Sequence, residues 1–148
     1  MFLRGDFRKG QINDFTTMVD VSLFQSFLKP KSVAIVGASA DPKKTGSRAQ
    51  RFLLSHGYKG KVFPVNPNRK EIFGLKCYPN LKSINEQVDH IFVAVDGNKI
   101  IEAIEDATSI KVRCASILSG GFSEAGSEGN HLEKHIFKIA QKGDLRIL

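Results

Sequence analysis

A loop with the composition of a phosphate-binding site lies in the segment SVAIVGASADPKKTGSR, residues 32–48. An apolar run ends at Gly37, a polar stretch with two lysines follows, and a segment with helical character begins near Gly46. The free backbone N–H groups and the dipole at the start of a helix favour an anion. We therefore predict that this loop binds phosphate, although an ordinary surface loop with solvated lysines is the alternative. The candidate residues are Gly37, Ala38, Ser39, Lys43, Lys44 and Gly46.

Two features disfavour NAD as the ligand. The loop lacks the second and third glycines of the pattern G-x-G-x-x-G. In NAD-binding domains an acidic residue after the second strand binds the ribose hydroxyls. Here PVNPNRKEIFG, residues 64–74, has Asn66 at that place, and Arg69 and Lys70 precede its first carboxylate, Glu71. This end suits a ribose that carries a phosphate, as in coenzyme A or NADP, unless it is only a proline-rich turn.

Two further apolar runs end in polar segments that contain glycine, VAVDGNK and ILSGGFSEAGSEG. In the first, Asp96 fits a turn at least as well as a ligand contact. In the second, the stretch Ser119–Gly121 is able to present backbone N–H groups to one end of a ligand or to a reacting carbonyl. Glu124 fits an acid–base group, but a glutamate favoured by the dipole of a helix start explains it equally well.

Apolar runs that alternate with helical patterns predict the fold that positions these segments. Nearly continuous apolar runs are typical of strands covered on both faces of a parallel sheet. We therefore expect an α/β domain with a Rossmann-like, doubly wound, mainly parallel sheet of about five strands and helices on both faces. Residues 1–20 are expected to form a weakly structured extension, and residues 21–148 the domain. The expected strands are 32–36, 61–65, 89–95, 112–118 and 145–148, and the expected helices are 46–56, 98–108 (capped by Asn98) and 125–142, after a short helix between residues 20 and 30.

The positive charge of the chain is concentrated in one stretch. The net charge is +7, and residues 40–82 alone contain ten basic and two acidic residues. Such a local excess indicates an anionic ligand. A solvated basic surface or a weak nucleic-acid patch is the alternative, but no interleaved aromatic residues or recognition motif accompany the stretch, so we expect no nucleic-acid partner.

Cysteine and histidine usage limits the remaining classes of protein. The two cysteines, Cys77 and Cys114, are too few for a disulfide framework, which favours a reducing, cytoplasmic location. The four histidines have no partners at the spacing of a zinc site, so no metal is expected. No apolar stretch approaches the roughly 20 residues that a membrane span needs, and no secretory signal is evident.

The ordered set LKPKSVAIVGAS, GYKGKVFPVNPNRKEIFGLKCYPNL, VDHIFVAV and SGGFSEAG resembles a known family. These segments are similar to the N-terminal CoA-binding domain of nucleoside-diphosphate-forming acyl-CoA synthetases, which are relatives of the succinyl-CoA synthetase α subunit. The resemblance extends from about Leu23 to Leu148. No single motif in it is decisive, but the order of the set is specific.

This resemblance implies a role for each strand end. The loop from Gly37 to Gly46 would hold the phosphates of CoA. The thioester end would be approached by the stretch from Ser119 to Glu124. Asp96 stands where family members often have proline, which puts that contact in doubt. Implied contacts with the adenosine and the rest of CoA come from Val65, Asn66, Pro67, Arg69, Lys70, Val95, Asp96, Ser119, Gly120, Gly121 and Phe122.

The resemblance also implies a reaction for the parent enzyme. Such a ligase interconverts acyl-CoA, nucleoside diphosphate and phosphate with the free acid, CoA and nucleoside triphosphate. The histidine that these enzymes phosphorylate lies in a following domain, and no histidine here has a matching context. We therefore expect this chain to bind CoA or acyl-CoA and to need downstream domains or a subunit, in an oligomeric full enzyme. A stand-alone regulatory CoA-binding protein and an NADP-binding oxidoreductase domain remain alternatives.

Overall fold

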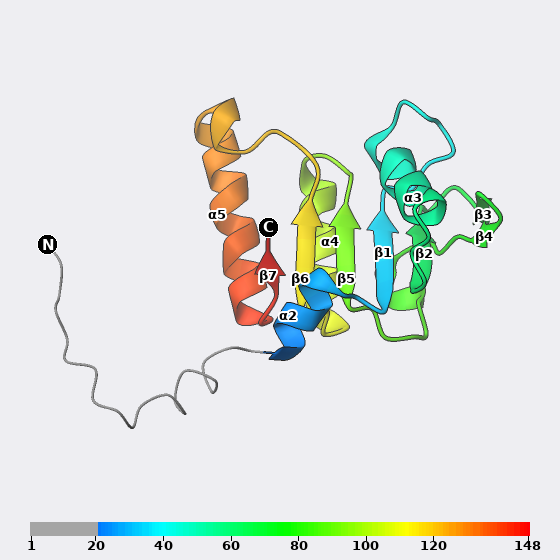
Figure 1. The fold of residues 1–148 in the computed structure, drawn as a ribbon. Helices are drawn as coiled ribbons and strands as arrows, with labels where there is room; N and C mark the ends of the chain where they lie inside the picture. Colours follow the sequence, from blue (N-terminus) through cyan, green and yellow to red (C-terminus); the bar gives the residue numbers. More distant parts are fainter. Residues whose placement is uncertain (1–20) are drawn as a thin grey trace, which may run out of the picture.

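The computed structural model describes residues 21–148, and the expected extension over residues 1–20 lies outside them. Five parallel strands form one sheet in the order β2-β1-β5-β6-β7 (Figure 1). This confirms the predicted α/β class and the predicted parallel sheet. The strands are β1 (Ser32–Val36), β2 (Lys61–Val65), β5 (His90–Val93), β6 (Cys114–Ile117) and β7 (Arg146–Ile147).

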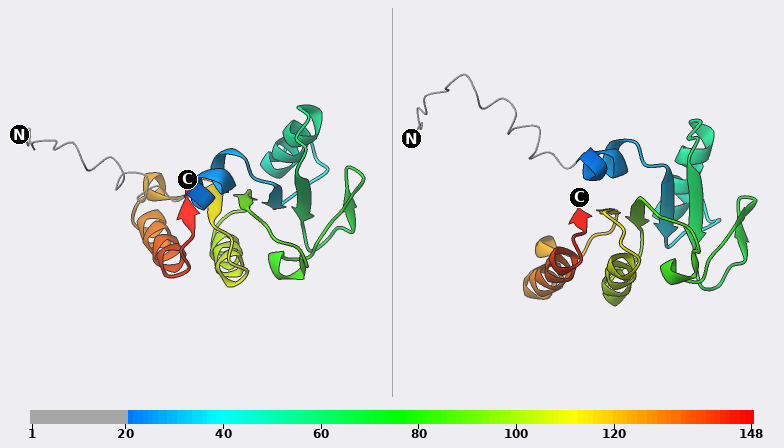
Figure 2. Two further views of the ribbon diagram at one scale, coloured as in Figure 1. Left: turned by 60° about the horizontal axis from the view of Figure 1, so that its bottom comes forward. Right: turned by 90° about the horizontal axis from the view of Figure 1, so that it is seen from below.

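Helices cover both faces of the sheet. Helices α2 and α3 lie on one face, and α4 and α5 lie on the other (Figure 2). Helix α4 starts at the expected residue, α3 starts one residue earlier than expected, and α5 starts two residues later. Gly97, with φ of 58°, is the residue that caps α4, and the expected cap Asn98 is the first residue within the helix. The helices are α2 (Val21–Leu28), α3 (Thr45–Ser55), α4 (Asn98–Ser109) and α5 (Ser127–Lys142), with short 3-10 turns η1 (Leu81–Ser83) and η2 (Ser123–Ala125).

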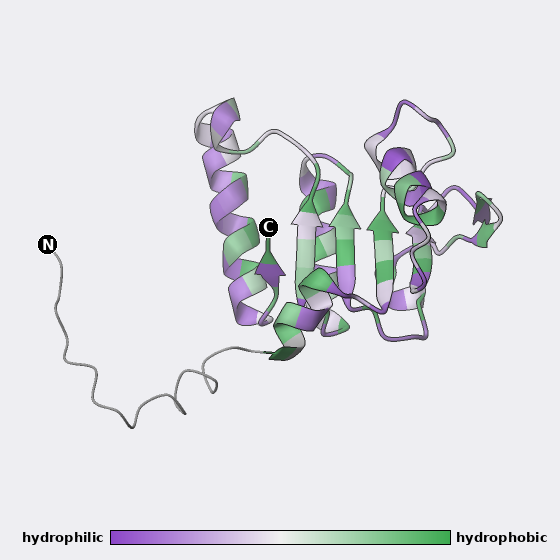
Figure 3. Cartoon of the chain, viewed as in Figure 1, coloured by the Kyte–Doolittle hydropathy of each residue, from purple (hydrophilic) through white to green (hydrophobic). Residues whose placement is uncertain are grey.

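Alternate strand residues divide the core into two layers. Ala34 and Ile91 point into the larger layer beneath α4 and α5, together with Ile100 and Ile104 of α4. Val33 and its neighbours point into the smaller layer beneath α3. Figure 3 shows the strands as mostly hydrophobic. Within residues 21–148 no helix has the length and apolar character to cross a membrane.

A short hairpin that the sequence analysis did not anticipate follows β2. Its strands β3 (Glu71–Ile72) and β4 (Leu75–Lys76) are antiparallel, and Phe73 and Gly74 at its tip both have positive φ. After the hairpin the chain runs beside the end of β2. The Tyr78 N–H donates to the Pro64 carbonyl at 2.9 Å, and the Asn66 N–H donates to the Tyr78 carbonyl at 2.8 Å. This pairing fixes the chain at the carboxyl end of β2.

The helix α2 is held on the sheet around a buried histidine. Nδ1 of His90 lies 3.3 Å from the Ser26 carbonyl oxygen of α2, and Nε2 lies 3.0 Å from Oγ of Ser116. The imidazole also packs between the rings of Phe27 and Phe92. Burial lowers the pKa of His90, and the hydrogen bond with Ser26 opposes this only partly. The neutral imidazole is therefore the form that the folded protein favours.

Acidification should consequently weaken the fold through His90. Because its folded pKa lies below the ordinary 6.5, the unfolded chain binds this proton first, and stability is lost as the pH falls below about 6.5. We expect the free energy of unfolding of the wild type, measured by urea denaturation, to fall between pH 7.5 and pH 5.5. We expect a smaller fall for His90→Phe, whatever its absolute stability. Equal falls in both proteins would show that another group is responsible.

Candidate functional site

The carboxyl ends of β1, β2 and β5 form the topological switch point of the sheet. From β1 the chain crosses to β2 on one side, and it later returns to β5 on the other side of β1. Ligands of doubly wound folds bind in the crevice that this reversal opens. Two hollows of about 350 and 390 Å³ lie there side by side, and Gly37 lines both of them. We call them the apolar hollow and the polar hollow.

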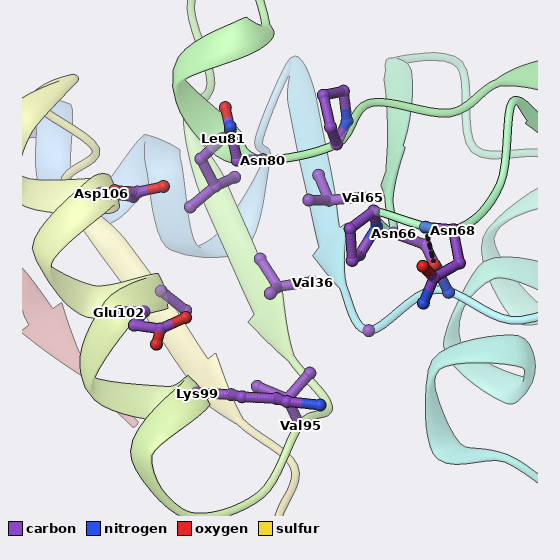
Figure 4. A pocket seen from close by; sticks show the side chains of 14 residues that line it. Val36, Val65, Asn66, Asn68, Asn80, Leu81, Val95, Lys99, Glu102 and Asp106 are labelled. Atoms are coloured by element: carbon purple, nitrogen blue, oxygen red, sulfur yellow. Dashed lines mark hydrogen bonds between the residues drawn. The ribbon is translucent and has the colours of Figure 1, made fainter.

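The apolar hollow lies between α4 and the segments that follow β2 and the hairpin (Figure 4). Aliphatic and proline side chains make most of its wall. Three charged side chains of α4 stand along one side of it, as Figure 4 shows for Lys99, Glu102 and Asp106. Such a wall suits a flat, largely apolar group with polar atoms at its edge. Its lining residues are Val36, Gly37, Val65, Asn66, Pro67, Asn68, Pro79, Asn80, Leu81, Val95, Lys99, Glu102, Ala103 and Asp106.

The polar hollow lies on the other side of Gly37, between the β1–α3 loop and the loops after β5 and β6. The start of α3 borders this hollow. Lys44 is the N-cap residue of α3, and its side chain makes no capping hydrogen bond. The first turn of α3 contains no acidic residue, so its backbone N–H groups and dipole stay available to an anion. The lining residues are Gly37, Ala38, Ser39, Lys44, Thr45, Asn66, Ala94, Val95, Asp96, Lys99, Leu118 and Ser119.

Two glycines let backbone segments meet closely at this point. Gly37 has φ of 85°, and a Cβ there would collide with the Ala94 carbonyl oxygen and approach Cγ1 of Val95 to 2.7 Å. A Cβ on Gly46 would collide with the Gly37 carbonyl. Gly46 therefore seats α3 directly on the loop after β1, the role that the third glycine has in dinucleotide-binding turns. The sequence analysis predicted Gly46 to be a ligand contact, and in the structure it packs against the Gly37 carbonyl.

Backbone hydrogen bonds decide which donors the β1–α3 loop can offer. The N–H groups of Gly37 and Ala38 both donate to the Val65 carbonyl, at 3.1 and 3.2 Å. Further along the loop, Oδ1 of Asp41 accepts from the Lys43 N–H at 2.9 Å. The N–H groups of Gly37 and Ala38 are therefore not available to a ligand, whereas the start of α3 and the Lys44 ammonium are. Lys43 is exposed and lies outside both hollows.

Asn66 joins the two halves of the site with its side chain. Nδ2 donates to the Ala38 carbonyl at 2.8 Å, and Oδ1 accepts from the Asn68 N–H at 2.9 Å. The amide therefore ties the loop after β2 to the loop after β1. The sequence analysis read Asn66 as a substitute for the ribose-binding carboxylate of NAD proteins, but its polar atoms are used within the protein. Its contribution to a site is to hold the two loops together.

In the loop after β6, the Glu124 carboxylate bonds to the backbone of its own loop. Oε1 of Glu124 accepts from the Gly121 N–H at 2.7 Å, and backbone N–H groups of Glu124, Gly121 and Phe122 lower the pKa of the Glu124 carboxyl. This ionised group caps its own loop, so it is poorly suited to acid–base work. Ser119 lines the polar hollow with its Oγ 2.6 Å from the Val95 carbonyl oxygen.

The structure brings ten of the predicted site residues to the two hollows and leaves the others outside. Arg69 and Lys70 are exposed beyond Asn68, at the outer end of the loop after β2. Phe122 lines a separate apolar hollow with Ile136 and Phe137. The ten are Gly37, Ala38, Ser39, Lys44, Val65, Asn66, Pro67, Val95, Asp96 and Ser119. Those outside the lining are Lys43, Gly46, Arg69, Lys70, Gly120, Gly121 and Phe122.

The sequence analysis missed the contribution of α4. Lys99, Glu102 and Asp106 are spaced by three and four residues, which puts them on one face of a helix. This spacing was a usable signal, but it does not tell which end of the sheet the face meets. Nζ of Lys82 in η1 lies 2.6 Å from Oδ1 of Asp106, and the hydrogen bond that Lys82 donates to this carboxylate raises the pKa of Lys82. Of the three, Asp106 is thus the one whose charge is already balanced.

Other chemistry finds no support in the described residues. Burial raises the pKa of both Cys77 and Cys114, which keeps the thiols protonated and unreactive. Among residues 21–148 no group of three or more histidine, cysteine, aspartate or glutamate side chains is arranged to hold a metal ion.

Substitution of Gly46 by alanine should test the seat of α3. The new methyl group would meet the Gly37 carbonyl, so α3 must move away from the sheet. We expect a loss of about 1–3 kcal/mol in the free energy of unfolding, as for other overpacked positions. Thermal or urea unfolding measures it, with Arg48→Ala on the exposed face of the same helix as the control. A Gly46→Ala protein as stable as the control would contradict the packing role.

Comparison with known proteins agrees with this geometry. Residues 31–148 match the family described as CoA binding domain. ADP-forming acetate–CoA ligase II of Archaeoglobus fulgidus is 39% identical over 118 residues, which are 80% of this chain and 18% of the ligase. The alpha subunit of ADP-forming acetate–CoA ligase I of Pyrococcus furiosus is 34% identical over 128 residues, 84% of this chain and 28% of the subunit.

Solved structures show the same fold. The dinucleotide-forming acetyl-coenzyme A synthetase 1 of Ca. Korarchaeum cryptofilum, in complex with phosphate and ADP, superposes with a TM-score of 0.80 and 38% identity over 84% of this chain and 26% of that one. The chain thus spans between 18% and 28% of the length of these relatives. A conserved hypothetical protein of Pyrococcus furiosus, 31% identical with a TM-score of 0.63, is covered over 90% of its length. Its fold, its switch-point hollows and these matches together identify the chain as a member of the CoA binding domain family.

Proposed function

We propose that this chain binds coenzyme A, or an acyl-CoA, across the two hollows at the switch point. The observation that carries the proposal is their junction above Gly37, within a domain that matches the CoA-binding family over residues 31–148. The start of α3 and Lys44 supply donors and positive charge for phosphate groups. The apolar hollow offers walls for an adenine ring. We assign the 3′-phosphate to the basic residues Arg69 and Lys70, which are exposed beyond Asn68.

We further propose that the domain serves an ADP-forming acyl-CoA synthetase. The proteins that are similar to this chain include ligases whose names specify acetate, CoA and ADP. In the reaction, acyl-CoA, ADP and phosphate are interconverted with the free acid, CoA and ATP. The chain corresponds to only a part of such enzymes, so further domains or a second subunit would supply the phosphoryl chemistry. Two buried, unpaired cysteines suit a reducing compartment such as the cytoplasm.

A stand-alone CoA-binding protein with a regulatory role is the second candidate. The Pyrococcus furiosus hypothetical protein favours it, because the alignment covers 90% of that chain and shows that the fold exists in proteins of about this size. Both candidates share the same ligand. They differ in whether the purified chain restores ATP formation from acyl-CoA, ADP and phosphate when it is combined with the remaining part of a ligase.

Calorimetric titration with CoA, dephospho-CoA, NADP and NAD tests the proposed ligand. We expect CoA to bind and the two nicotinamide dinucleotides to bind at least tenfold more weakly, because the β1–α3 loop does not have the G-x-G-x-x-G pattern of dinucleotide-binding domains. NADP binding without CoA binding would replace this proposal by a dinucleotide-dependent oxidoreductase domain. No binding of any of the four would refute a CoA site within this chain.

Charge reversal after β2 should separate the 3′-phosphate from the rest of the ligand. We expect the double variant Arg69→Glu, Lys70→Glu to bind CoA tenfold or more weakly than the wild type, since a charge-assisted hydrogen bond contributes about 1.5–3 kcal/mol. Its affinity for dephospho-CoA, which lacks that phosphate, should change much less. The double variant Lys134→Glu, Lys138→Glu, on the exposed side of α5, is the control for net charge. Equal losses for both ligands would place the 3′-phosphate elsewhere.

A further inference from the structure

The two hollows share a boundary formed by few residues. Gly37, Asn66, Val95 and Lys99 line both of them. A ligand that occupies both hollows must cross this boundary. The chemistry of the four residues therefore decides which part of a ligand can lie there.

Only one of the four residues has a charged side chain. Gly37 has no side chain, and the Val95 side chain is aliphatic. The amide of Asn66 is used by the Ala38 carbonyl and the Asn68 N–H. Lys99 alone brings a charged group to the boundary. Its side chain extends from α4 toward Val95, as Figure 4 shows.

The Lys99 ammonium is also available to a ligand. The ion pairs recorded among the described residues involve Lys61, Lys82, Arg113 and Arg146 as cations, and none of them joins Lys99 to a carboxylate within 4.0 Å. Asp96 lines the polar hollow and Glu102 the apolar one, so Lys99 stands between two acids without a bond to either. Its strongly hydrated charge would gain more from an anion in the crevice than from water.

A second lysine faces the crevice from the opposite side. Lys44 lies at the start of α3, and Lys99 lies in the first turn of α4. These helices cover opposite faces of the sheet (Figure 2). Both lysines line the polar hollow, so an anion in it is approached by one cation from each face. This arrangement matches a doubly charged group better than a single sugar hydroxyl or a neutral chain.

We propose that Lys99 binds the diphosphate of CoA at the point where the ligand passes from one hollow to the other. This inference rests on the proposed function, since it names a further residue of the same site. Lys99 binds a part of the ligand that CoA and dephospho-CoA share. Its removal consequently weakens both ligands by the same factor, unlike changes at Arg69 and Lys70, which act through the 3′-phosphate.

Titration of three variants of the full chain tests this role. Lys99→Met keeps the length of the side chain and removes its charge, Lys99→Arg keeps the charge, and Lys138→Met removes an exposed charge from α5. We expect Lys99→Met to lose about tenfold in affinity for CoA and for dephospho-CoA alike. Lys99→Arg should recover most of this loss, and Lys138→Met should bind as the wild type does.

The outcomes separate this inference from the proposed function. A wild type that fails to bind CoA overturns the proposed function. A wild type that binds CoA while Lys99→Met binds equally well overturns the inference and leaves the function intact. Equal losses in Lys99→Met and Lys138→Met point to net charge alone, which also overturns the role of Lys99. A loss for CoA without a loss for dephospho-CoA moves Lys99 to the 3′-phosphate.

Discussion

The contact of Gly46 with the Gly37 carbonyl is the constraint on which the site depends. It brings the start of α3 against the end of β1, where any larger residue would hold the helix away. The close approach delivers the N–H groups and the dipole of α3 to the switch point, and with them Lys44. The long β1–α3 loop therefore achieves with the close contacts of two glycines, Gly37 and Gly46, what a compact dinucleotide turn achieves with three.

Asn66 extends this constraint to the second loop. Its side chain bonds to the Ala38 carbonyl and to the Asn68 N–H, while its own N–H bonds to Tyr78. Three segments far apart in the sequence are thus joined at one residue. The Val65 carbonyl adds to the joint by accepting from both Gly37 and Ala38. This hydrogen-bond network holds in place the boundary between the two hollows. Its polar groups bond to one another within the protein.

The sequence predicted the framework well, because the framework depends on continuous apolar runs and on helical periodicity. All five expected strands and the three long helices are present within a few residues of their expected bounds. The hairpin around Phe73 was missed because its strands have two residues each, too short for any periodicity. The carboxylate of Glu124 was read as a possible acid–base group because its bond to the Gly121 N–H depends on loop geometry, which the sequence does not reveal.

The segment at Tyr78 pairs with the end of β2, an edge strand, and this limits where a strand of another molecule can add to the sheet. The Tyr78 segment occupies the outer hydrogen-bonding groups of Pro64 and Asn66, so a foreign strand cannot pair with the sheet at the end of β2 where the hollows lie. The opposite edge is β7, separated from β1 by two strands. An added strand on that side would pair with β7 and not with β1, β2 or β5. Any pairing of the sheet with another strand at this edge would therefore use other backbone groups than those that the Tyr78 segment occupies at the end of β2.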